Sequence, residues 1–242
     1  MVFSILPAID VYRGRLARYA ASGPVPVGSF GGDPALAAEA FAARGCRWIH
    51  LVDMVPVFDG GPADPDVVAS IRHRCPDVAI QISGGITTWE AARTYLDAGA
   101  TRFVVGSAAL VDEPAVFDLL SRAGAEALVG LEIEAGRILS RGRDRVELDL
   151  SATLAWLVAL EPPGFLVTAV DRVGELRGPD VALVRRVAGS GVPTLAAGGI
   201  AGPDDLRSLR AAGAVGAVVG RGALEGGLDL ADALAWAALD RG

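Results

Sequence analysis

The stretch Ser83-Gly84-Gly85-Ile86 returns later in the chain as Ala197-Gly198-Gly199-Ile200. A second pair of related stretches follows, Val104-Val105-Gly106-Ser107-Ala108-Ala109-Leu110 and then Val218-Val219-Gly220-Arg221-Gly222-Ala223-Leu224. The separation from Gly84 to Gly198 equals that from Gly106 to Gly220, 114 residues. A repeat this regular indicates two related halves, each supplying a matching site.

Glycines in this setting can bind anions. In each half they follow an apolar strand and precede a helix, where backbone N–H groups can approach a phosphate closely. Two such sites indicate a substrate with a phosphate at each end. The alternative is that the glycine pairs only turn strands into helices, but the equal offset of the two copies favours phosphate binding.

The composition is typical of an α/β protein. Its 242 residues suffice for one large domain or two small ones, and no linker rich in Pro, Ser or charge separates the halves. We therefore expect one domain over residues 1–242. Hydrophobic content is 52% and aromatic content 6%, so small aliphatic residues build the core, as in parallel strands covered by helices. The net charge of −7 argues against a nucleic-acid or anionic-membrane partner.

The sequence predicts neither a targeting segment nor a metal-binding motif. Residues 1–5 have no basic region, and no stretch approaches the roughly 18 apolar residues of a membrane span. We therefore expect a cytoplasmic protein. Cys46 and Cys75 lack metal-ligand spacing and are interpreted as small, partly buried apolar residues.

The order of expected elements predicts a (β/α)8 barrel. Strands are expected at 3–9, 48–52, 78–82, 102–105, 127–133, 165–170, 194–197 and 217–219. Helices are expected from Asp33-Pro34 to Gly45 and at 65–74, 89–98, 114–123, 150–160, 180–188, 203–212 and 230–239. Residues 12–32 are expected to form a loop, and 134–148 a loop or short hairpin. The half-by-half repeat favours the closed barrel over an open doubly wound sheet.

Candidate catalytic groups follow from this fold, because active sites of such barrels lie at the carboxyl ends of the strands. Asp10 and a carboxylate near the end of the fifth or sixth strand are expected on opposite sides of the barrel mouth, the opening formed by the carboxyl ends of the strands. One can protonate a ring oxygen while the other removes a C–H proton. His50 fits either core packing or a polar support role, Asp53 either anchors a loop or touches substrate, and His73 is expected to be solvated.

These motifs resemble those of a known family. Leu6-Pro7-Ala8-Ile9-Asp10, Ile49-His50-Leu51-Val52-Asp53, Ser83-Gly84-Gly85-Ile86, Val105-Gly106-Ser107 and Val219-Gly220-Arg221-Gly222-Ala223-Leu224 look like the histidine-biosynthetic ProFAR isomerases. The likeness covers essentially the whole chain and extends to the actinobacterial phosphoribosyl isomerases A, which also isomerise phosphoribosylanthranilate for tryptophan. Ser83 is similar to that dual-substrate branch.

The resemblance implies a (β/α)8 barrel, an Amadori rearrangement of a phosphoribosylamine and no cofactor or metal. It implies that Asp10 is the base. The substrate-binding residues expected here are Arg18, Ser83, Gly84, Gly85, Gly106, Ser107, Arg141, Arg143, Gly198, Gly199, Gly220 and Arg221. The expected partner is a small phosphoribosyl substrate, and we expect a monomer.

Three positions depart from the family pattern. The family aspartate expected near the end of the sixth strand, in a Thr-Asp context, falls on Ala169, and the strand-five aspartate is Glu132. The Arg-Gly-Trp element of the dual-function enzymes reads Arg141-Gly142-Arg143, without the tryptophan. Asp171, two residues beyond Ala169, is predicted on the same strand face and is preferred to Glu132 as the acid.

The leading hypothesis is a phosphosugar aldose–ketose isomerase acting on ProFAR, on phosphoribosylanthranilate or on another phosphoribosylamine. The rival is a phosphate-ligand binding protein that has lost catalysis. Ala169 supports the rival, whereas retention of Asp10 opposes it. The related cyclase is disfavoured, because strand one lacks the cysteine that the cyclases place there.

Overall fold

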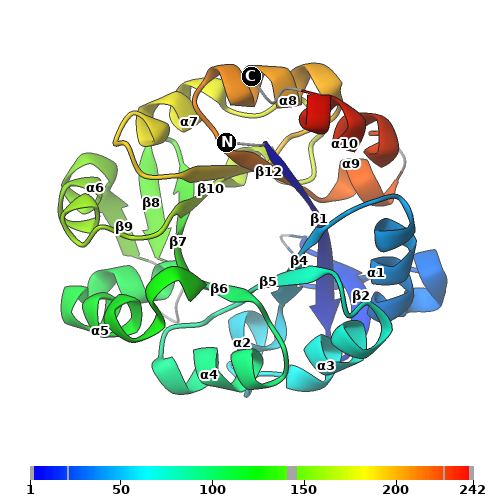
Figure 1. The fold of residues 1–242 in the computed structure, drawn as a ribbon. Helices are drawn as coiled ribbons and strands as arrows, with labels where there is room; N and C mark the ends of the chain where they lie inside the picture. The colour runs from blue at the N-terminus through cyan, green and yellow to red at the C-terminus, as the bar shows by residue number, and fades with distance from the viewer. Residues whose placement is uncertain (1–2, 21, 141–145, 226, 240–242) are drawn as a thin grey trace.

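Parallel strands close into a barrel at the centre of the structure (Figure 1). The computed structural model describes residues 3–20, 22–140, 146–225 and 227–239. Within this part of the chain the barrel strands are β1 (Ser4–Tyr12), β4 (Trp48–Asp53), β5 (Ala79–Ser83), β6 (Arg102–Val105), β7 (Ala127–Glu134), β10 (Phe165–Ala169), β11 (Thr194–Ala197) and β12 (Gly216–Val219). They pair in this order, and β12 pairs in parallel with β1 to close the ring. The predicted closed barrel is confirmed.

Helices cover the outside of the ring in Figure 1, as expected where helices connect parallel strands. They are α1 (Pro34–Ala43), α2 (Val55–Phe58), α3 (Pro65–Arg74), α4 (Trp89–Asp97), α5 (Glu113–Ala123), α6 (Leu150–Ala159), α7 (Val181–Ala188), α8 (Pro203–Ala211), α9 (Arg221–Leu224) and α10 (Leu230–Leu239). Short 3-10 turns are η1 (Ser29–Gly32), η2 (Ser107–Val111), η3 (Gly124–Glu126) and η4 (Val170–Arg172). None of the described helices combines the length and apolar character needed to cross a bilayer.

The sequence marks the helix starts with acidic caps. Asp33 accepts hydrogen bonds from the Ala35 and Leu36 amides, with Pro34 in the first turn, as the sequence predicts. Asp64, Asp112, Asp149 and Asp180 cap their helices in the same way. Each cap satisfies an amide that has no partner within the helix and so stabilises the start of the helix.

Two apolar layers result from the alternation of side chains along each strand. The outward side chains, such as Phe103 and Phe165, pack against the helices in the larger core. The inward side chains fill the barrel with a smaller cluster made of Leu6, Ala8, Val104, Leu128, Leu166, Leu195 and Val218. The same alternation decides which residue at the end of a strand reaches the mouth.

The expected loop at 12–32 is wrong in part, because a hairpin forms at its start. β1 continues to Tyr12 and pairs in antiparallel fashion with β2 (Arg15–Arg18), which in turn pairs with β3 (Val25–Pro26). Arg13 and Gly14 have φ values of 50° and 74°, so both central turn residues are left-handed. Such two-residue turns match the twist of the flanking strands, which explains the hairpin.

The second half repeats this feature. β8 (Arg137–Ser140) folds back on β7 and pairs with β9 (Val146–Asp149), so the short hairpin considered for 134–148 is present. Its turn residues Ala135 and Gly136 have φ values of 48° and 77°. The internal repeat therefore includes a hairpin after the first strand of each half as well as the glycine pairs.

Candidate active site

Two candidate catalytic carboxylates lie on facing strands. Asp10 is on β1 and Glu132 on β7, and four strand steps separate β1 from β7 in either direction around the ring. Both follow the inward alternation, Asp10 after Leu6 and Ala8, and Glu132 after Leu128. The structure therefore places them across the barrel mouth from each other, as the sequence predicts.

Asp10 lies in an environment that disfavours its charge. Desolvation raises the pKa of its carboxyl to about 6, and a hydrogen bond from the Tyr19 backbone opposes part of that rise. The side chain is still partly exposed toward the mouth. At neutral pH this carboxylate is largely ionised yet has a basicity suited to removing a proton.

Glu132 is linked to a predicted phosphate ligand. The hydroxyl of Ser107 donates to Glu132 Oε2 at 3.2 Å, and Ser107 itself is buried. Glu132 remains partly exposed at the end of β7. The structure thus brings together a candidate acid on β7 and an expected phosphate-binding serine at the start of η2, the turn that follows β6.

The placement expected for Asp171 is wrong. β10 ends at Ala169, and Val170–Arg172 form the 3-10 turn η4, so the strand alternation does not extend to Asp171. Its side chain is 52% exposed and lies 3.5 Å from Arg172 Nε. Asp171 therefore does not share a strand face with Ala169, and the geometric reason for preferring it to Glu132 is lost.

Position 169 does not face the mouth either. Within β10, Leu166 belongs to the barrel interior, whereas Phe165 and Val167 belong to the outer core. Alternation puts Ala169, which is 3% exposed, on the outer face, and the half-buried Thr168 on the inner face. Thr168 is not among the site residues expected from the sequence. It lies two residues after the inward Leu166, and strand alternation therefore predicts it on the same inner face.

The glycine pairs are required by packing in both halves. A Cβ on Gly84 would lie 1.9 Å from the Asp53 carbonyl oxygen, and one on Gly198 2.6 Å from that of Ala169. Both glycines have positive φ, 121° and 100°. These contacts support the simple role of turning strands into helices, and they are compatible with anion binding without demonstrating it.

Gly220 differs from those glycines. Its φ is −86°, and an added Cβ would meet nothing nearer than Ala8 Cβ at 3.9 Å. Neighbour packing therefore leaves room at this position, which a ligand at the mouth can use. Gly106 is tighter, because a Cβ added there would lie 3.3 Å from the Ile86 carbonyl oxygen, so its lack of a side chain has a packing explanation.

The expected arginine ligands are scattered. Arg221 donates to Glu225 Oε2 at 2.7 Å and to the Gly174 carbonyl at 2.7 Å, tying α9 to the loop after η4. Arg18 is exposed at the end of β2. Arg141 and Arg143 lie outside the described residues.

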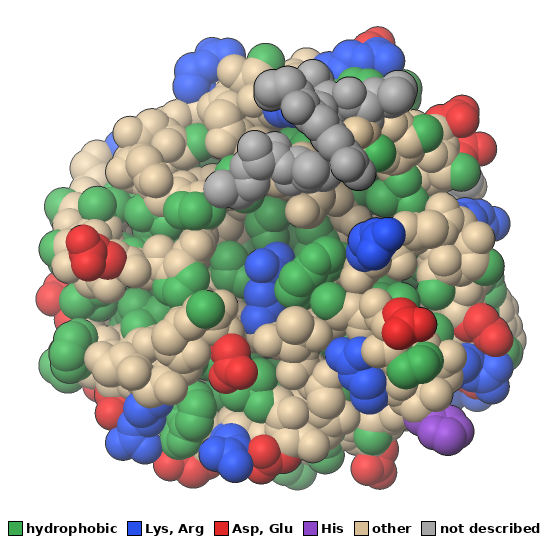
Figure 2. Space-filling view, viewed as in Figure 1, with side chains coloured by type: hydrophobic (Ala, Val, Ile, Leu, Met, Phe, Trp, Pro, Cys, Tyr) green, Lys and Arg blue, Asp and Glu red, His purple; other side chains and the backbone are tan. Residues whose placement is uncertain are grey.

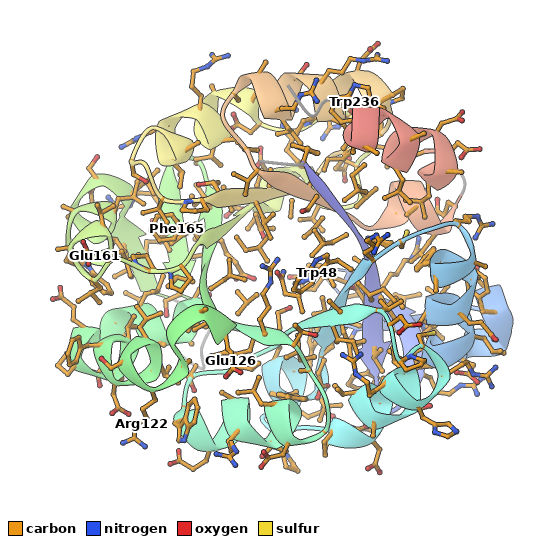
Figure 3. All side chains as sticks on the ribbon, in the orientation of Figure 1. Trp48, Arg122, Glu126, Glu161, Phe165 and Trp236 are labelled. Carbon is orange, nitrogen blue, oxygen red and sulfur yellow. The ribbon has the colours of Figure 1, made fainter. Side chains whose placement is uncertain are left out.

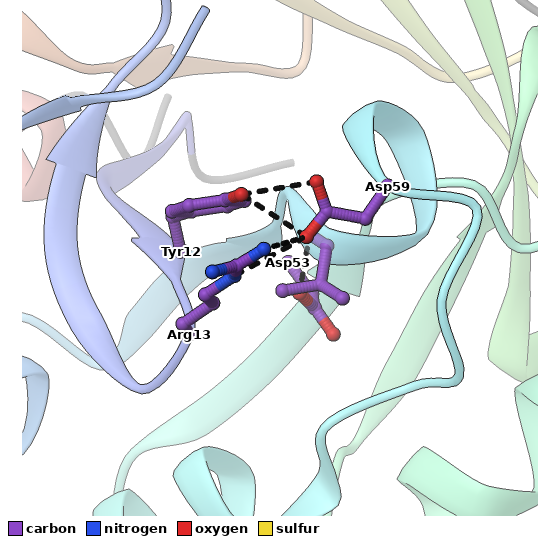
Figure 4. A network of polar contacts seen from close by, with 5 residues as sticks. Tyr12, Arg13, Asp53 and Asp59 are labelled. Carbon is purple, nitrogen blue, oxygen red and sulfur yellow. Dashed lines mark hydrogen bonds and ion pairs between the residues drawn. The ribbon is translucent and has the colours of Figure 1, made fainter.

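Two loops at the mouth are held together by Asp59. Tyr12 Oη donates to the Asp59 carboxylate at 3.0 Å, and Arg13 Nη2 forms an ion pair with it at 3.0 Å (Figure 4). The rings of Tyr19 and Phe58 add a contact with centroids 5.7 Å apart. The ion pair is exposed to water, which screens it, so it orients the hairpin without fixing its position.

Asp53 anchors a loop. It accepts hydrogen bonds from the Val55 and Asp64 amides at 2.9 and 3.0 Å and from Tyr95 Oη at 2.6 Å. Asp53 and Tyr95 are both buried, and this settles the choice left open for Asp53 in favour of the structural role.

The cysteines and histidines have the surroundings expected of them. Cys46 and Cys75 are buried free thiols, and His73 is exposed on α3. His50 is buried and hydrogen-bonded to Gln81 and Ser83, which favours the polar support role. Among the described residues, no group of three or more His, Cys, Asp or Glu side chains is arranged to hold a metal ion.

Comparison with known proteins gives a consistent picture. Residues 4–229 match the family model described as histidine biosynthesis protein. The chain belongs to this family. A relative from Moorella thermoacetica is 34% identical over 97% of this chain and 98% of its own length. One from Parafrankia sp. is 37% identical over 98% of this chain and 97% of its own length. Both are named 1-(5-phosphoribosyl)-5-((5-phosphoribosylamino)methylideneamino) imidazole-4-carboxamide isomerase, the ProFAR isomerase of the resemblance.

The raised pKa of Asp10 predicts a stability effect in this family member. Ionising Asp10 is easier in the unfolded chain, where its pKa is near 3.8, than in the fold, where it is about 6. Below pH 3.8 the carboxyl is protonated in both states, and the fold has its full stability with respect to this group. That stability falls as the pH rises above 3.8, and the loss is complete once the pH has passed 6, where Asp10 is ionised in the fold as well. Asp10→Asn should therefore raise the free energy of unfolding at pH 8 by roughly 2–3 kcal/mol. Urea unfolding at pH 8 and pH 4 tests this; most of the gain should be lost at pH 4, and a variant less stable than wild type at pH 8 contradicts the desolvation of this carboxylate.

The outward face of position 169 predicts the outcome of restoring an aspartate there. Ala169→Asp should bury an unpaired carboxylate against the outer core and lower the free energy of unfolding by about 3 kcal/mol or more. Asp171→Asn, at an exposed site in the adjacent turn, is the control and should change stability little. An Ala169→Asp variant as stable as wild type shows that this side chain reaches solvent at the mouth.

Proposed function

We propose that this protein is an aldose–ketose isomerase that acts on a phosphoribosylamine. The observation that carries the proposal is Asp10, an inward carboxylate with a raised pKa, facing Glu132 across the mouth of the barrel. The names of the relatives support ProFAR as a substrate. Ser83 is the feature that supports phosphoribosylanthranilate as a second one.

The two carboxylates suit the steps of an Amadori rearrangement. Glu132, as the acid, gives a proton to the ring oxygen while the bond from that oxygen to C1 breaks and C1 forms a double bond to nitrogen. Asp10, as the base, then takes the proton from C2, and the electron pair moves to form the enolamine. C1 receives a proton as the C2 hydroxyl becomes the ketone, so the reaction needs no external oxidant or reductant.

Glu132 is preferred to Asp171 as the acid because of its placement. It faces Asp10 from the inner face of β7, whereas Asp171 lies in an exposed turn. The glycine-bearing ends of β5, β6, β11 and β12 are proposed to bind the phosphates at the two ends of the substrate. We further propose that the protein acts as a monomer in the cytoplasm.

Steady-state assays on both substrates test this function. Asp10→Asn and Glu132→Gln should each lower kcat by at least about 10²-fold, the usual contribution of general acid–base catalysis, while the variants stay folded. Asp171→Asn should leave kcat within a few-fold. Loss of activity in Asp171→Asn with full activity in Glu132→Gln reverses the assignment of the acid.

Complementation of histidine and tryptophan auxotrophs identifies the substrates. Rescue of the histidine auxotroph, and its loss with Asp10→Asn, supports ProFAR isomerisation in the cell. Failure to rescue either strain, together with phosphate binding by the purified protein, supports the rival view of a binding protein that has lost catalysis.

A further inference from the structure

Three polar side chains form one layer inside the barrel, next to a cluster of apolar side chains. His50 on β4, Gln81 on β5 and Arg102 on β6 are direct register partners on adjacent strands. All three follow the inward alternation of their strands. A run of three polar residues among small aliphatic ones needs a reason, because burial of polar groups is unfavourable unless each finds a partner.

The partners are found within the layer. Arg102 Nε donates to Gln81 Oε1 at 2.8 Å, and Gln81 Nε2 lies 2.8 Å from His50 Nδ1. His50 Nε2 lies 3.2 Å from Ser83 Oγ. Gln81 is 0% and His50 4% exposed, so water does not compete for these contacts. The result is a continuous chain from Arg102 to Ser83.

The series of hydrogen bonds begins with Arg102, at the end of the barrel opposite the mouth. The Arg102 guanidinium carbon lies 4.1 Å from the centre of the Trp48 ring, and Trp48 is the first residue of β4 (Figure 3). Figure 2 shows basic side-chain atoms at the centre of this face, surrounded by hydrophobic ones. The chain ends at Ser83, the last residue of β5, which is partly exposed and directly precedes Gly84-Gly85.

The chemistry of these groups decides which atom donates and which accepts in each hydrogen bond of the series. A guanidinium can only donate, so Gln81 must accept with its oxygen and donate with its nitrogen. His50 Nδ1 therefore accepts and carries no proton. Burial and the nearby charge of Arg102 lower the pKa of His50 to about 3, so the ring is neutral at pH 7. Its single proton then lies on Nε2 and is donated to Ser83 Oγ.

The consequence falls on the serine hydroxyl. A free hydroxyl can donate or accept, but Ser83 Oγ already accepts from His50. Its own proton is left to point elsewhere, and the exposed side of Ser83 is the barrel mouth. Since this proton cannot be directed at His50, it is available to an acceptor at the mouth, such as an anionic phosphate oxygen.

We propose that His50, oriented by Gln81 and Arg102, is a positioning residue that fixes Ser83 as a hydrogen-bond donor to a phosphate oxygen of the substrate. The phosphate as ligand rests on the proposed function. The ordered chain itself rests on the contacts inside the barrel. It directs the Ser83 hydroxyl proton away from His50 before any ligand arrives, so the first glycine site presents a hydrogen-bond donor.

The protonation state of His50 can be read without activity. His50 and His73 are the two histidines of the sequence, so ¹⁵N-histidine labelling gives two ring systems, and a His73→Gln variant assigns them. At pH 7 His50 should carry its proton on Nε2 and none on Nδ1. A proton on Nδ1, or on both nitrogens, overturns the proposal.

Binding of inorganic phosphate tests the effect on Ser83. Shifts of the Gly84 and Gly85 amide signals report binding at this end of the mouth. His50→Leu removes the donor to Ser83 and should weaken phosphate binding there about tenfold, the usual scale for a hydrogen bond to a charged group. His50→Gln keeps an N–H near the position of Nε2 and should recover most of the affinity.

A double-variant cycle separates positioning from simple structural support. If His50 acts through Ser83, His50→Leu combined with Ser83→Ala should bind phosphate no more weakly than Ser83→Ala alone. The same variants should raise KM about tenfold with little change in kcat. Additive losses, or a fall in kcat with KM unchanged, overturn the proposal.

These readouts also distinguish the proposal from the function on which it rests. Site-specific phosphate binding with the expected coupling, but no turnover, contradicts the isomerase and leaves the positioning role intact. Thermal melting of each variant checks folding; if His50→Leu does not fold, the wild-type proton assignment and the His50→Gln affinity still decide the question.

Discussion

Closure of the barrel is the constraint on which the site depends. In a closed ring every second side chain of a strand points inward. A residue can therefore reach the mouth only if it occupies one of these inward positions. Asp10 on β1 and Glu132 on β7 occupy inward positions, and Ala169 on β10 occupies an outward one. The pair of facing carboxylates is a consequence of this geometry, and so is the loss of position 169 as a catalytic site.

The barrel interior balances packing against chemistry. Most of its inward side chains are aliphatic, and the polar chain from Arg102 to Ser83 is tolerated because each member is hydrogen-bonded. Asp10 is the contrasting case, since burial makes its ionised form unfavourable and raises its pKa. That unfavourable environment is what gives the carboxylate its basicity, at a cost in stability.

Much of the fold could be predicted from the sequence. The glycine repeat and the acidic helix caps are local signals, and they predict the barrel, most strand positions and the facing placement of Asp10 and Glu132. The hairpin after β1 differs from the expected loop because Arg13 and Gly14 both adopt left-handed conformations and form a two-residue turn. The position expected for Asp171 is wrong because strand alternation ends at Ala169, where the chain turns into η4.

The candidate site was less predictable, because it depends on which neighbours meet. The contact of Ser107 with Glu132 and the link from His50 to Ser83 join residues far apart in the chain. The glycine pairs posed the opposite problem. Their sequence pattern indicates phosphate binding, yet Gly84 and Gly198 are also required by close backbone contacts with the preceding strands.

Hydrogen exchange during turnover tests most directly whether Asp10 removes a proton from carbon. With a phosphoribosylamine substrate in D2O, the account predicts a ketose product that carries deuterium at C1, and no labelled product from an Asp10→Asn variant that still binds the substrate. Recovery of substrate that binds the wild-type protein but is neither converted nor labelled contradicts the account.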